Sequence, residues 1–187
     1  MLDIILQAVA VAATALAWIP QFVLILRRRD LAGLSTSSWA LGGATGLVFA
    51  LYGLRTHVWS LTASEGLFAL GALVITAFLV KPGRLAVSLP PVAGAAYLLS
   101  LCPGVIIGVV GFIGSLLMRV LQIHRARQSP STSGISATSW LLLTLNCSAW
   151  GFYGALTNHW PLTATSVMVL AASLILVLQV RVLRQKG

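Results

Sequence analysis

Seven apolar runs alternate along the chain with short clusters of cations, glycine, proline, serine and threonine. Most runs approach the roughly 20 residues that an α-helix needs to cross a membrane. The pattern therefore predicts an all-α membrane protein with seven transmembrane helices. The fourth run is the weakest, because it is short and contains two adjacent prolines. The runs extend from Asp3 to Leu26, Trp39 to Leu54, Val58 to Val80, Leu85 to Leu101, Val105 to Ile123, Trp140 to Leu156 and Trp160 to Leu183.

The amino-acid composition excludes a soluble globular protein. Hydrophobic residues make up 58% and charged residues 8% of the 187 positions, whereas about a quarter of the residues in a soluble domain are charged. The net charge of +9 is then a signal of membrane topology, and no nucleic-acid partner is expected. The first run has no basic n-region and no cleavage site, so we expect a retained span and not a signal peptide.

The cations lie almost entirely on one side of the seven runs, and the other side holds Arg55 alone. Because cytoplasmic loops are rich in Lys and Arg, this pattern predicts an N-terminus outside the cell and a C-terminus in the cytoplasm. The pattern also supports the fourth helix. Without that crossing, the cations of the second half would lie on the opposite side of the membrane from those of the first half. The cations of the crowded side are Arg27, Arg28, Arg29, Lys81, Arg84, Arg119, Arg125, Arg127, Arg181, Arg184 and Lys186.

Residues that often build catalytic or metal sites are scattered. Cys102 and Cys147 lie in unrelated apolar contexts, so neither a disulfide framework nor a zinc site is supported. His57, His124 and His159 lie at the edges of runs on both sides, without carboxylates at useful spacing. No nucleophile, base and orienting acid can be assembled. We therefore expect no enzyme activity, no cofactor and no metal.

An internal repeat relates the two halves of the chain at a constant offset of 101 residues. The repeat predicts that helices 1 to 3 and 5 to 7 are copies of one unit, and that helix 4 lets both copies run in the same direction. The expected units are residues 1–80 and 104–187, with a linker helix in 81–103. Two such bundles would enclose a central path. Matched residues are Gln21 with Gln122, Gly33 with Gly134, Ser35 with Ser136, Trp39 with Trp140, Tyr52 with Tyr153 and Trp59 with Trp160.

Several strings in both copies resemble the PQ-loop repeat. The string AWIPQFVLILRRRDLAGLSTSSW places Pro20 and Gln21 before a basic turn, and ALYGL and WGFYGAL resemble the end of that repeat's second helix. This superfamily includes SWEET and SemiSWEET sugar transporters and cystinosin-like amino-acid transporters, and the 3+1+3 layout is SWEET-like. The resemblance implies alternating-access transport of a small polar solute, sugar or amino-acid-like, in a bacterial plasma membrane. Leu121 departs from the family pattern, which has proline there.

The resemblance assigns a gating hinge to Pro20, because proline inside a helix removes a backbone hydrogen bond and bends the helix. A fixed kink that only helps packing is the other interpretation. Gln21 and Gln122 are expected near the inner mouth, with amides available to freed backbone groups or solute, although Gln122 also fits a simple membrane-interface position. Tyr52 and Tyr153 complete the expected hinge and gate residues.

Glu65 is the one acid deep inside an apolar run. Ionised carboxylates at membrane depth are costly, so such groups face a cavity or have partners, and burial favours their neutral form. We therefore expect Glu65 to face the central path and to bind a positive group or a proton. The alternative is a structural acid paired with Arg55 or with a nearby serine.

The resemblance also predicts a substrate pocket. In sugar-transporting members a binding-site asparagine aligns with Glu65 and, in the second copy, with Ser166, while a tryptophan aligns with Phe49 and Trp150. Asn146, one turn before Trp150, is expected to share the lining or to link two helices. Both family asparagines are missing, which favours a proton-coupled or cationic substrate over a neutral sugar.

Two functional classes remain, a transporter and a membrane receptor or assembly subunit that shares the PQ-loop fold without transport. The short loops favour the transporter. Its expected partners are a small-molecule solute, the lipid bilayer and, with proton coupling, protons, and a homo-oligomer is left open. Tryptophans at predicted helix starts are expected to be interfacial anchors; these are Trp39, Trp59, Trp140 and Trp160.

Overall fold

The computed structural model describes residues 1–28, 31–80, 98–129 and 131–185. Long helices joined by short turns make up nearly all of these residues, in agreement with the predicted all-α class. The expected linker helix falls mostly outside the described residues, as do Arg29, Lys81, Arg84 and Lys186. The long helices are α1 (Leu2–Arg28), α2 (Thr36–Arg55), α3 (Trp59–Leu79), α5 (Gly104–Gln128), α6 (Ala137–Thr157) and α7 (Trp160–Gln185).

Three of the described helices are long and apolar enough to cross a membrane, namely Leu2–Arg27, Trp59–Leu79 and Gly104–Gln128. Large apolar side chains are exposed along the bundle, for example Ile113 on α5 and Val167 on α7. Soluble monomers rarely expose apolar patches of large extent, whereas lipid tails match such a surface. These helices fit an integral membrane protein, and the count of seven spans stays a prediction.

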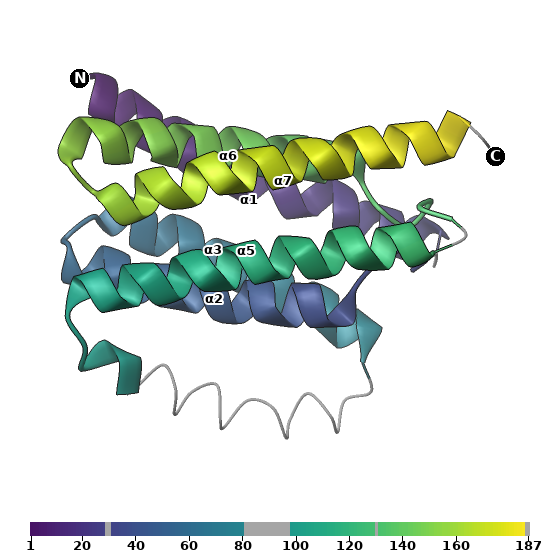
Figure 1. The fold of residues 1–187 in the computed structure, drawn as a ribbon, viewed down its shortest axis with the longest axis horizontal. Helices are drawn as coiled ribbons and strands as arrows, with labels where there is room; N and C mark the ends of the chain where they lie inside the picture. Colours follow the sequence, from purple (N-terminus) through teal and green to yellow (C-terminus); the bar gives the residue numbers. More distant parts are fainter. Residues whose placement is uncertain (29–30, 81–97, 130, 186–187) are drawn as a thin grey trace.

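The six helices contact one another in a closed ring. In ring order they are α1, α6, α7, α5, α2 and α3, and α3 contacts α1 again. Figure 1 shows α1, α6 and α7 on one side of the bundle and α2, α3 and α5 on the other. The helices α1, α3, α5 and α7 all end at the same end of the bundle. We call this the basic end, because Arg27 and Arg125 lie there. Such a ring leaves a central axis that side chains from several helices can line.

Residues 101 positions apart adopt the same local geometry. Ser35 and Ser136 begin α2 and α6 in the same way, since each side chain accepts a hydrogen bond from the backbone N–H three residues later, at 3.1 and 3.2 Å. After the last turns of α2 and α6, His57 and Asn158 both have a φ of 58°. This left-handed conformation turns the chain away from a helix. Matching local sequence therefore produces matching helix ends.

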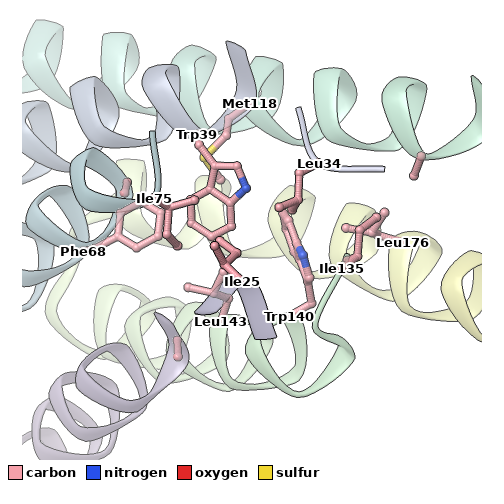
Figure 2. Packing of buried hydrophobic residues seen from close by; sticks show 13 residues of the cluster. Ile25, Leu34, Trp39, Phe68, Ile75, Met118, Ile135, Trp140, Leu143 and Leu176 are labelled. Atoms are coloured by element: carbon pink, nitrogen blue, oxygen red, sulfur yellow. The ribbon is translucent and has the colours of Figure 1, made fainter. Parts of the chain in front are cut away.

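The buried apolar side chains form two clusters, one toward each end of the bundle. The basic-end cluster contains Trp39, Trp140 and Leu176, together with Leu34 and Ile135 from the turns before α2 and α6. Figure 2 shows the two indole rings inside this cluster. The opposite-end cluster is built around residues of α2 and α6, with contributions from α1, α3, α5 and α7; its larger members are Phe49, Tyr52, Leu61, Ile107, Trp150, Tyr153 and Leu162.

The expectation that all four helix-start tryptophans anchor the interface is wrong for two of them. Trp39 and Trp140 are only 4% and 2% exposed, because the turns that precede them fold inward and cover the core. Trp59 and Trp160, at the opposite end, are 65% and 53% exposed. Their exposure is compatible with the interfacial role, so the interfacial prediction is retained for these two residues alone.

Candidate functional site

A cavity of about 50 Å³ lies on the axis of the ring, between the two apolar clusters. Five helices line it, because the middle turns of α2, α3, α5, α6 and α7 all face inward at this level. Apolar walls come from both clusters and polar groups lie between them. The polar lining consists of Thr45, Glu65, Ser115, Arg119, Asn146, Cys147, Thr165 and Ser166.

The five residues predicted from the sequence as substrate-binding all line this one cavity. They are Phe49 on α2, Glu65 on α3, Asn146 and Trp150 on α6, and Ser166 on α7. Phe49, Asn146, Trp150 and Ser166 are buried, and Glu65 is partly buried. The structure thus brings together residues that are up to 117 positions apart in the chain.

Two glycines allow the polar side chains of α3 and α7 to lie close to the neighbouring helices. A Cβ atom at Gly46 would lie 2.9 Å from the backbone oxygen of Glu65, and one at Gly151 would lie 2.6 Å from the Cβ of Ser166. Both distances are shorter than non-bonded carbon atoms tolerate. Glycine at these positions therefore sets how near Glu65 and Ser166 come to α2 and α6.

Glu65 faces groups from the other half of the chain. Arg119 on α5 and Asn146 on α6 line the same cavity as Glu65 on α3. Within the described part of the chain Glu65 forms no ion pair with Arg55, and the Arg55 guanidinium donates to the backbone oxygen of Ser100. Asn146 lines the cavity, and its role in linking two helices stays a prediction.

Arg119 is the site residue that the sequence interpretation missed. It was counted among the cations of the crowded side, but it is 5% exposed and lines the cavity. Its Nη1 donates to the backbone oxygen of Ser115 at 3.3 Å, its Nη2 lies 3.8 Å from the Cys147 sulfur, and its Cζ lies 6.0 Å from the Trp140 ring centroid. The signal that could have found it is its position well inside an apolar run, the same signal that identified Glu65.

Several buried polar atoms of the lining have no hydrogen-bond partner among the residues that the structure describes. They are Nε of Arg119, Oδ1 of Asn146 and Nε1 of Trp150. Buried polar groups are normally hydrogen-bonded, and leaving one unsatisfied costs about 1–3 kcal/mol. Two donors and one acceptor therefore remain available around one cavity, a combination that suits a small polar solute.

Toward the basic end, the cavity is covered by a hydrogen-bonded layer built around Gln21 and Gln122, both fully buried. Nε2 of Gln21 donates to the backbone oxygen of Gly134, and its Oε1 accepts from the backbone N–H of Ser136, at 2.8 and 2.9 Å. Gln122 makes the same two bonds to Gly33 and Ser35, at 2.8 and 3.1 Å. Protein surrounds the Gln122 side chain, and the membrane-interface position considered for it stays a prediction. Pro20 precedes Gln21 within α1.

Toward the other end, the cavity is covered by aromatic residues. The Tyr52 hydroxyl and Nδ1 of His159 are 3.2 Å apart, and the Tyr153 ring stacks on the His159 ring with centroids 6.1 Å apart. Phe49 and Trp150 contact these tyrosines edge to face from the cavity side. Burial lowers the pKa of His159 below its ordinary value of 6.5, because desolvation penalises the charged ring.

Within the described residues, no three His, Cys, Asp or Glu side chains gather closely enough to hold a metal ion. Comparison with protein-family models, with curated proteins and with solved structures finds no match to this chain. The chemistry of the cavity and of its two covering layers is therefore the basis for assigning a function.

Proposed function

We propose that this protein moves a small polar solute across a membrane by alternating access, and that it belongs to the PQ-loop superfamily that its sequence resembles. The solute binds in the central cavity. The two copies of the repeated unit, in a 3+1+3 layout, rock against each other and expose that cavity to one side at a time.

The observation that carries this proposal is a cavity with unpartnered polar atoms that is covered at both ends by contacts between the two halves of the chain. At the basic end, Gln21 bonds the turn before α6, and Gln122 bonds the turn before α2. At the other end, Tyr52 of α2 meets His159 of the α6–α7 turn. Breaking either layer while the other holds would open the cavity to one side only, which alternating access requires.

The charge pattern supports an orientation with the basic end in the cytoplasm and the N-terminus outside, and the family resemblance supports a bacterial plasma membrane as the location. Removing Arg119 from the cytoplasmic set leaves ten cations there against Arg55. The bias therefore survives the reassignment of Arg119, and in this orientation the glutamine layer is the cytoplasmic gate.

The first test is uptake by sealed vesicles that contain the purified protein, with labelled sugars, amino acids and vitamins, with and without a pH gradient. Saturable uptake above that of protein-free vesicles is expected for at least one of these solute classes. Uptake equal to that of protein-free vesicles for every solute would contradict transport and favour a receptor or assembly role.

A cross-link tests the rocking motion itself. In a chain with Cys102→Ser and Cys147→Ser, the pair Gln21→Cys and Ser136→Cys joins the two halves when a short bifunctional thiol reagent is added. Cross-linking should abolish uptake, and reduction of a reducible reagent should restore it, because the cytoplasmic layer can then open again. The matched control is the pair His124→Cys and Gln128→Cys, two exposed positions one turn apart on α5, which the same reagent joins within one helix and which should leave uptake unchanged.

A further inference from the structure

We infer that the solute is a small zwitterion of the α-amino-acid type, whose carboxylate binds Arg119 and whose ammonium group binds Glu65 and Asn146. This inference rests on the proposed function only in taking the central cavity as the solute site. The evidence is the charge, burial and spacing of these three side chains.

Two opposite charges face the cavity from different helices without touching. Within the described residues, the ion pair of the N-terminal ammonium with Asp3 is the only one with an N–O distance of 4.0 Å or less. Glu65 on α3 and Arg119 on α5 nevertheless line the same cavity. A gap wider than an ion pair, with the cavity beside it, leaves room for a group that carries one charge toward each side chain.

Arg119 has the capacity to bind a carboxylate. A guanidinium has five N–H donors in a planar fork that matches a carboxylate. Among the described residues, the polar contacts of Arg119 are the Ser115 backbone oxygen and the sulfur atoms of Met118 and Cys147, all at 3.3 Å or more, and its Nε has no partner there. These are weak contacts for a buried cation. A solute carboxylate would supply the anionic acceptors that the protein itself does not place there.

Glu65 and Asn146 provide the complementary side. A carboxylate and an amide oxygen are both acceptors for an ammonium group, which has three N–H donors. The Asn146 oxygen has no hydrogen-bond partner in the described part of the chain, and the residue is 6% exposed. An ammonium group that bridges this oxygen and Glu65 would satisfy both.

The size of the cavity selects among zwitterions. A cavity of about 50 Å³ accommodates only a small solute. That space suits an amino acid with a short side chain and is small for a hexose. Phe49, Leu61 and Leu162 form apolar walls against which a methyl group can pack.

The native Cys147 thiol lines the cavity and serves as a reporter of binding. In the full-length protein with Cys102→Ser, Cys147 is the single thiol, and its modification by methyl methanethiosulfonate is followed by mass spectrometry. The ligands are L-alanine, propionate, ethylamine and glucose. L-alanine should slow the reaction about tenfold when roughly nine-tenths of the sites are occupied. Propionate and ethylamine each lack one charge, so their apparent affinities should be lower by about tenfold or more.

Two substitutions assign the two charges. Arg119→Gln should remove the advantage of L-alanine over ethylamine, and Glu65→Gln should remove its advantage over propionate. A purely structural role for either residue would weaken all ligands alike. Arg125→Gln, an exposed arginine on the same helix as Arg119, and Asp3→Asn, the acid at the start of α1, are the matched controls and should keep the wild-type order of ligands.

Two further measurements keep the inference testable. If a single substitution prevents folding, the double variant Glu65→Gln with Arg119→Gln removes both charges together and should bind L-alanine no better than propionate or ethylamine. If Cys147 does not react in the free protein, the shift of thermal unfolding by the same four ligands replaces the labelling. A double variant that still prefers L-alanine would overturn the inference.

The outcomes separate this inference from the proposed function. Protection by glucose and not by L-alanine, with glucose uptake in vesicles, overturns the zwitterion and leaves transport standing. Protection by L-alanine with no uptake of any solute supports the zwitterion site and contradicts transport. Equal protection by L-alanine and propionate in the unsubstituted site would overturn the role of Glu65 as the ammonium ligand.

Discussion

Gln21 and Gln122, which stand 101 positions apart in the sequence, make the same two hydrogen bonds to each other's half of the molecule. Each amide spans the turn before a helix of the other half. In both cases the NH₂ group donates to a glycine carbonyl and the oxygen accepts from the backbone N–H of a helix-capping serine. The two halves of the chain are thus held together at the basic end by two matching pairs of hydrogen bonds.

Gln21→Ala and Gln122→Ala should destabilise the protein by similar amounts. Each removes two buried hydrogen bonds and leaves a backbone carbonyl and N–H without partners, which costs roughly 1–3 kcal/mol per unsatisfied group. Thermal unfolding in detergent measures the loss, and Gln128→Ala, at the exposed end of α5, is the control. An unchanged unfolding temperature in both variants would show that the bonds add nothing to stability.

Pro20→Leu should impair transport more than folding if Pro20 is a hinge. The second half already has Leu121 at the matching position, so Leu121→Pro in the Pro20→Leu protein should restore part of the activity by moving the bend to the other half. Uptake per correctly folded molecule is the measurement. Full uptake by Pro20→Leu would make the proline a packing feature.

Cysteine labelling tests the orientation. Arg127→Cys at the basic end should react only with reagent that reaches the cytoplasm, and Asn158→Cys in the α6–α7 turn should react with an impermeant maleimide outside intact cells. The chain with Cys102→Ser and Cys147→Ser removes the native thiols and is the background. Labelling of Arg127→Cys from outside would contradict the proposed topology.

Acid should weaken the contacts among Tyr52, Tyr153 and His159, which cover the cavity at the end opposite the basic end. Because burial lowers the folded-state pKa of His159, its contribution to stability is present above the ordinary value of 6.5 and is lost as the pH falls toward the lowered pKa. The unfolding temperature of the wild type should therefore fall more on acidification than that of His159→Gln. His124→Gln, which changes an exposed histidine on α5, should behave like the wild type.

Glu65→Gln keeps the size of the side chain and fixes the neutral state. If Glu65 binds the ammonium group of the solute, both pH-gradient-driven accumulation and downhill exchange should fall by about tenfold or more. A loss confined to gradient-driven accumulation would instead assign proton coupling to Glu65. An unchanged response in both assays, at normal expression, would leave it a structural role.

Much of the candidate site could be found from the sequence because the repeat and the family resemblance point to particular helical positions. Phe49, Glu65, Trp150 and Ser166 were selected in this way, and the structure places them around one cavity together with Asn146. Arg119 was missed because its matched position in the first half is Trp18, which gives no polar signal. The count of cations on the two sides also placed Arg119 with the loop cations, because such a count does not consider how far a residue lies from the end of its helix.

The sequence by itself determined the helical class and most of the helix limits. Apolar runs of membrane-spanning length and their Gly, Ser and cation boundaries act through nearby residues. For this reason α7 begins at the predicted Trp160, and α3 begins one residue after the predicted Val58. Only the tertiary structure decided which way side chains near the ends face. Trp39 and Trp140 lie in the core, and Gln21 and Gln122 bond distant turns, because these outcomes depend on which helix packs alongside. That choice is a property of the whole ring, which no local pattern encodes.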